Sequence, residues 1–181
     1  QKLASGKEGA SEAALLAKAQ LAAWALGEGD RRTALELSSQ ALELGRSPLV
    51  RTAAALCRTA AGAPPEGAAS TQPLVRLGMA YGSLLEGRYR EAANLLEKLA
   101  AEADPLGAEQ AHILLAWALL ETGREAEAAP LVETFGLPQA GVEPVFGYLT
   151  FPRIFVLRSR VLEMQGRKAE AARAKEIAQK L

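Results

Sequence analysis

The chain has 181 residues, of which 49% are hydrophobic and 5% aromatic, so it is long enough to bury a continuous apolar core. Its 21 basic and 21 acidic side chains give a formal net charge of zero, which disfavours binding to nucleic acid or to an anionic membrane. One cysteine and one histidine exclude a disulfide framework and a zinc site of the usual kind. No stretch approaches the ~20 apolar residues of a membrane-spanning helix, so we expect no membrane insertion.

The first residues, QKLASGKEG, contain neither an initiator methionine nor the apolar core of a signal peptide. We expect residues 1–10 to be a flexible lead-in that followed an upstream segment. The compartment stays open between the cytoplasm and, if the upstream segment carried a signal or an anchor, the periplasm. Residues 11–181 are expected to form a single helical repeat domain, because alanine and other strong helix formers dominate their composition.

One short pattern recurs four times along the chain: a glycine, then a polar residue, then an alanine five positions after the glycine. The glycines are Gly29, Gly87, Gly123 and Gly166. Glycine can end a helix in the left-handed conformation, and the polar residue after it can open the next helix. The pattern therefore predicts helical hairpins, whose apolar faces become buried only when neighbouring hairpins stack.

The apolar periodicity around these glycines predicts about nine helices and almost no strand. In chain order we expect helices at 12–27, 30–44, 48–61, 73–86, 88–103, 107–122, 125–135, 152–165 and 167–180. They form pairs at about 12–44, 73–105, 107–135 and 152–181. Residues 48–72 form a degenerate pair, in which the breaker-rich segment 62–72 runs along the preceding helix in place of a second helix.

A further irregularity is the segment 135–152, which is rich in proline, glycine and aromatic residues. We expect a non-helical excursion that folds against the stack near Trp117 or Pro130 and gives way to helix only at Pro152. Pro130 should shorten or kink the helix 125–135, because proline lacks the backbone N–H that an interior helical position donates.

Segments such as LGMAYGSLLEGRYREAANLLEKLAAEADP resemble tetratricopeptide repeats, including the tyrosine two residues after Gly87 and the terminal Pro105. The resemblance covers most of the chain, although only Leu74 to Pro105 comes close to the full pattern, and most glycine spacings depart from the usual repeat of about 34 residues. It implies an all-α fold, a right-handed superhelical stack of antiparallel helix pairs. It also implies a scaffold for protein or peptide partners, and no enzyme.

In tetratricopeptide stacks the first helix of each pair lines a concave groove, and the resemblance implies the same here. Counted from the marker glycines, the candidate partner-binding residues are Leu77, Tyr81, Leu84, Ile113, Trp117 and Leu120. This apolar and aromatic lining suits a partner helix or an apolar peptide, and it disfavours the clamp for a terminal carboxylate that some family members carry. Alternatively, the lining is covered by the segment 136–151, by the C-terminal helix, or by a second copy in a homodimer.

No catalytic, cofactor or metal pattern emerges from the remaining residues. His112 has no acidic partner nearby, and Cys57 lies on an apolar helical face, where it is expected to be a buried hydrophobe. Arg153 and Arg160 belong to a locally basic C-terminal region, either a solvated face or a contact for an acidic partner. Two alternatives to the scaffold remain: a regulatory or sensory domain of a larger bacterial polypeptide, with or without a membrane anchor, and a self-associating module.

Overall fold

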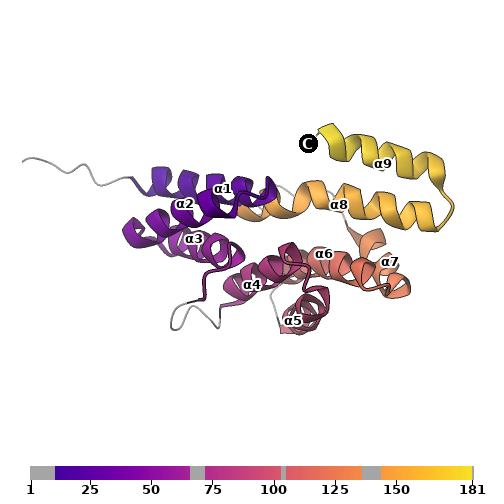
Figure 1. Cartoon of the computed structure of the whole chain (residues 1–181), viewed down its shortest axis with the longest axis horizontal. Helices are drawn as coiled ribbons and strands as arrows, with labels where there is room; N and C mark the ends of the chain where they lie inside the picture. Colours follow the sequence, from indigo (N-terminus) through magenta and orange to yellow (C-terminus); the bar gives the residue numbers. More distant parts are fainter. Residues whose placement is uncertain (1–10, 66–71, 103–104, 136–143, 181) are drawn as a thin grey trace, which may run out of the picture.

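The computed structural model describes residues 11–65, 72–102, 105–135 and 144–180. The expected lead-in at 1–10 lies outside these residues. So does the part 66–71 of the segment 62–72, which was expected to run along the preceding helix. Within the described part the chain is all-α, with nine helices and no strand (Figure 1). The helices are α1 (Glu12–Gly27), α2 (Arg31–Leu44), α3 (Pro48–Ala60), α4 (Pro73–Leu85), α5 (Tyr89–Glu102), α6 (Pro105–Glu121), α7 (Glu125–Thr134), α8 (Pro144–Met164) and α9 (Lys168–Lys180).

The hairpin turns form as the glycine pattern predicts. Gly29, Gly87, Gly123 and Gly166 have φ values of 82°, 74°, 74° and 77°, the left-handed region that ends a helix without steric cost only at glycine. All helices except α8 begin and end within two residues of the expected positions. The pattern alanines, five residues after each glycine, are fully or almost fully buried.

Short polar contacts fix the start of each second helix. In the first hairpin the Asp30 carboxylate accepts a hydrogen bond from the Thr33 backbone N–H at 3.0 Å. In the other three hairpins an arginine directly after the glycine pairs with a glutamate three residues further on: Arg88 with Glu91, Arg124 with Glu127, and Arg167 with Glu170. The negative charge lies in the first turn, where the helix dipole favours it.

The first helices of the pairs, α1, α3, α4, α6 and α8, pack side by side in that order, and α2, α5, α7 and α9 pack on them from outside. Neighbouring first helices are parallel, as α6 and α8 show. Thr150 near the start of α8 donates to Gln110 near the start of α6 at 2.7 Å, and Arg160 further along α8 pairs with Glu121 at the end of α6. Figure 1 shows the start of α8 beside the end of α1. Because α8 packs against α1 as well as α6, the row of first helices closes into a ring.

α3 is the first helix that has no second helix in the described part of the chain. It packs directly against α4. A Cβ atom on Gly78 would lie 2.5 Å from the Leu56 carbonyl oxygen, and one on Gly82 would lie 3.0 Å from the Ala60 carbonyl oxygen. This register shows that α3 and α4 are parallel.

The prediction for 135–152 is wrong in its second half. Instead of an excursion that ends at Pro152, the helix α8 begins at Pro144 and continues through Pro152. Pro144 occupies the first helical position, where a missing N–H removes no intrahelical bond, whereas Pro152 removes one bond from a helix of 21 residues. Residues 136–143 lie outside the described part. Pro130 lies inside α7, which has 10 residues and continues beyond it to Thr134, so a shortening or kink caused by Pro130 stays a prediction.

Candidate partner-binding site

The six candidate groove residues come from α4 and α6, and the structure buries all of them on the inside of the ring of first helices. Two of them, Tyr81 and Trp117, meet edge to face, with 6.2 Å between the ring centroids and 66° between the ring planes. The apolar face expected from the sequence therefore exists as a shared surface. In this arrangement it packs within the chain and presents no open groove.

The helix α8 closes this inner face. The Arg153 guanidinium lies over the Trp117 ring, 3.8 Å from its centroid, in the geometry of a cation–π contact. One turn earlier, the buried Thr150 makes its hydrogen bond to Gln110 of α6. We call residues 144–156 the inner segment of α8. Its residues 144–151 fall within the segment 136–151, one of the three possible covers named from the sequence, whereas the C-terminal helix α9 packs on α8.

The Tyr81 hydroxyl and the Cys57 thiol stay protonated near pH 7. Burial raises the pKa of Tyr81, although the charge of Arg153 and a hydrogen bond from it act in the opposite direction. Burial also raises the pKa of the Cys57 thiol to about 12, as predicted for a buried hydrophobe, and Sγ lies 3.5 Å from the Ala19 carbonyl oxygen. The cluster therefore supplies packing and hydrogen bonding, with no ionised thiolate that could act as a nucleophile.

The two candidate basic residues hold α8 in place within the chain. Arg153 contacts Trp117, and Arg160 pairs with Glu121. Between them along the helix, the Arg158 guanidinium donates to the Phe135 carbonyl oxygen at 2.6 Å. These contacts fasten α8 to α6 and to the end of α7.

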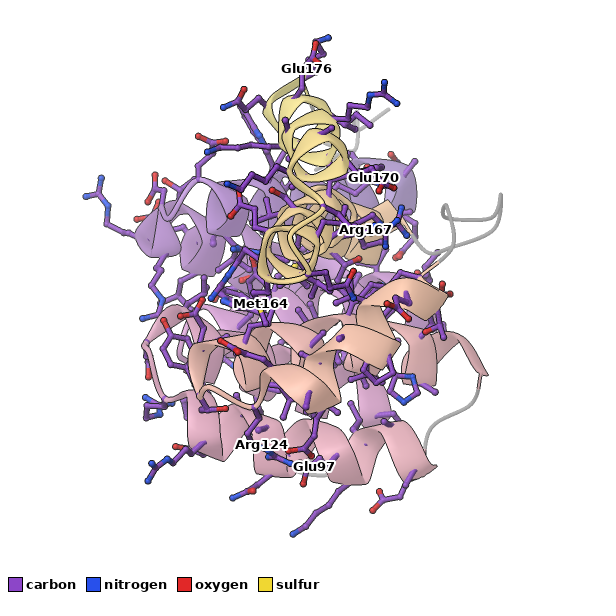
Figure 2. All side chains as sticks on the ribbon, turned by 90° about the vertical axis from the view of Figure 1, so that its right-hand side faces the viewer. Glu97, Arg124, Met164, Arg167, Glu170 and Glu176 are labelled. Carbon is purple, nitrogen blue, oxygen red and sulfur yellow. The ribbon has the colours of Figure 1, made fainter. Side chains whose placement is uncertain are left out.

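The described residues bring together no group of three or more histidine, cysteine, aspartate or glutamate side chains that could hold a metal ion. In the same part of the chain, no helix combines the length and apolar character that crossing a membrane requires. Several exposed carboxylates on the helix faces pair with arginines. Figure 2 shows Glu97 and Arg124 pointing toward one another between α5 and α7, with a separation of 3.0 Å.

Residues 83–141, which include α5, α6 and α7, match the model of the tetratricopeptide repeat. This part of the chain is similar to tetratricopeptide repeats. Comparison with curated proteins and with solved structures found no match. Tetratricopeptide repeats are in general scaffolds for protein–protein interaction, and stacked helix pairs of this kind are what the described residues form.

A pocket of about 460 Å³ lies against α3, between α2 and α4. Its lining includes Ala55 and Thr59 of α3, Leu42 of α2, Val75 of α4, and Pro65 in the segment after α3. The sequence predicted that the segment 62–72 runs along α3, and it indicated no binding residue there. The signal that could have found the pocket is the missing glycine and alanine pattern after α3, which indicates that no helix of the regular kind covers this face.

Proposed function

We propose that this chain is a scaffold that holds a protein partner, and that the partner places a helix on the inner face of the ring in exchange for the inner segment of α8. One observation carries the proposal: a helix already occupies this face, and its Arg153 stacks on Trp117, one of the two aromatic anchors. The type of repeat supports a general role in binding proteins, since tetratricopeptide stacks bind proteins. The apolar and aromatic lining supports the choice of surface.

The contacts of α8 support an exchange of this kind. α9 packs mainly on α8, so the two helices form a unit that is joined to the rest through α8. Among the contacts that fasten this unit, an exposed ion pair such as Arg160 with Glu121 contributes only about 0–1 kcal/mol, and a cation–π contact such as that of Arg153 about 0.5–2 kcal/mol. Ile154, Leu157 and Val161 of α8 are also buried in the core, so the unit leaves this face only where a partner helix replaces their packing.

The same contacts indicate the chemistry of the partner helix. It would carry an arginine or lysine that stacks on Trp117 and a polar side chain one turn earlier that bonds to Gln110. A purely acidic peptide would not suit this face, because the anchor that it meets is an aromatic ring.

The test uses a labelled synthetic peptide of residues 144–164 and the whole chain, with binding followed by fluorescence anisotropy. Arg153→Ala in the chain weakens its own α8, so the peptide should bind about 2- to 30-fold more tightly, which corresponds to the 0.5–2 kcal/mol of the lost contact. Arg90→Ala, at an exposed position on α5, is the matched control and should leave peptide binding unchanged. Absence of peptide binding to both the wild-type chain and Arg153→Ala would show that the inner face does not exchange helices, and the proposal would be wrong.

A further inference from the structure

We propose that two copies of this chain associate through the outer face of α1, with the two α1 helices antiparallel. We define the outer face of α1 by its exposed apolar side chains, Ala13, Ala14, Ala17, Leu21 and Trp24. In Figure 1 this helix lies at the upper edge of the molecule. The face is distinct from the inner face of the ring, so the inference holds or fails separately from the exchange of α8.

The outer face of α1 exposes large apolar side chains. Trp24 is 59% exposed, more than any other large hydrophobic side chain in the described part of the chain, and Leu21, one turn earlier, is 49% exposed. At the helical spacing, the residues of the face lie within an arc of about 100°, opposite the buried Leu15 and Ala22. An apolar stripe of this width is typical of a helix face that packs against another element.

No charged side chain interrupts this face, because the two charged residues of α1 bond to other parts of the chain. The Glu12 carboxylate accepts hydrogen bonds from the backbone N–H groups of Arg46 and Ser47 at 2.8 and 3.1 Å. The Lys18 ammonium donates to the side-chain oxygen of Gln40 on α2 at 2.7 Å. The outer face is therefore left with apolar groups alone.

The last helix, α9, has a different outer surface. It exposes Lys168, Glu170, Arg173 and Glu176 beside a single large apolar side chain, Ile177. Repeat stacks need such a polar outer surface on their terminal elements to stay soluble. Because α9 meets this requirement and α1 does not, we infer that the outer face of α1 is covered in solution.

The order of small and large residues along the face fits a second copy of the same helix. Ala14 and Ala17 occupy its N-terminal half, and Leu21 and Trp24 its C-terminal half. In an antiparallel pair with a two-fold axis level with Ala19, Trp24 of each copy lies over Ala14 of the other, and Leu21 lies over Ala17. Each large side chain then fills the space beside an alanine, so the face is complementary to itself.

The charges at the helix ends also favour this pair. Glu28 is exposed directly after α1 and would lie beside the start of α1 in the second copy, where the helix dipole is positive. No like charges meet between the two faces, because neither face carries any. Residues 1–10 contain one large apolar residue, Leu3, and so do not match the two large side chains of the face.

The size of the face sets the expected strength of the dimer. α1 has 16 residues and is therefore about 24 Å long. Two helix faces of this length bury less than the roughly 1,200 Å² at which standard stable interfaces begin. The dimer should accordingly be weak, with a Kd on the order of 10–100 µM.

The test is sedimentation equilibrium of the whole chain from about 5 to 500 µM, which spans the expected Kd. Trp24→Glu and Ala17→Glu should each raise the Kd at least tenfold, because a charge would then be buried between the helices. Met164→Glu is the matched control, at a methionine with 46% exposure near the end of α8 (Figure 2), and should leave the Kd unchanged. Circular dichroism melts check that all variants fold.

A charge pair tests the direction of the helices. Ala17→Glu in one chain lies directly opposite Leu21→Lys in a second chain only if the pair is antiparallel. An equimolar mixture of these two variants should associate at least fivefold more tightly than either variant alone. A mixture of Ala17→Glu with Ala14→Lys should recover less, because the antiparallel register separates the two charges by roughly 10 Å along the helix axis.

Three results would overturn the inference. If the chain is monomeric at all concentrations, or if Met164→Glu weakens association as much as Trp24→Glu, the outer face of α1 is not a dimer interface. If Ala14→Lys rescues Ala17→Glu as well as Leu21→Lys does, the helices are not antiparallel. If the chain dimerises only after residues 1–10 are removed, those residues cover the face and the second copy is not its occupant.

Discussion

Replacing Gly78 by alanine tests whether the close parallel contact of α3 and α4 is a specific feature of this stack. The new Cβ atom would lie 2.5 Å from the Leu56 carbonyl oxygen, a backbone atom that moves only if the two helices separate. Overpacking of this kind costs about 1–3 kcal/mol, and a contact this short with backbone falls in the upper half of that range. Alanine regains up to about 1 kcal/mol of helix propensity. The net loss should therefore be about 1–2 kcal/mol.

The assay is urea unfolding followed by circular dichroism at 222 nm, supported by the thermal midpoint, which should fall by about 2–4 °C per kcal/mol in a chain of this size. Gly27→Ala is the matched control. Gly27 is also helical, but a Cβ atom there meets nothing within 4 Å, so this variant should gain up to about 1 kcal/mol from propensity alone. If Gly78→Ala is as stable as Gly27→Ala, the close approach of α3 and α4 does not exist in solution and the reasoning is refuted.

Two further predictions follow from burial and capping. Cys57, fully buried with a pKa of about 12, should react with a thiol reagent at pH 8 at a rate limited by unfolding, and labelling of the folded chain at the rate of free cysteine would contradict its placement. The side-chain and backbone hydrogen bonds of Thr33 lower the pKa of Asp30, so its carboxylate stabilises the fold above the pKa of the unfolded chain, and this contribution is lost as the pH falls through the lower folded value. The difference in thermal midpoint between wild type and Asp30→Ala should accordingly shrink in acid; a difference that is constant from pH 7 to pH 2.5 would exclude this role.

The helices were predictable because the signals for their ends are local. A glycine that must take positive φ, a capping residue directly after it and a small residue at the crossing point lie within a few positions of each other, as in the hairpin from Gly29 to Ala34. The start of α8 depends on more distant contacts. The segment from Pro144 to Pro152 has the composition of a loop, yet Thr150 is buried against Gln110, and this packing outweighs the local preference.

The sequence predicted which surface carries the candidate site, but not whether that surface is open. Position relative to the marker glycines placed Tyr81 and Trp117 on a shared surface, and the structure brings their rings together. Whether that surface is open depends on whether α8 meets α1, two helices more than 100 residues apart in the chain. In a repeat stack such a contact depends on the small rotations between neighbouring helices, added along the chain. No local pattern encodes their total.

The incomplete second pair shows how one change in the repeat affects the two sides of the stack differently. A stack that merely lost a helix could close the gap with larger side chains on the neighbouring helices. Here the residues of α4 that face α3 are the smallest available, Gly78 and Gly82, so the first helices draw together on the inner side. The outer side keeps Leu35 and Met79 partly exposed around an open pocket. Because Gly78 brings α4 directly against the backbone of α3, the packing of these two helices needs no further helix beside them.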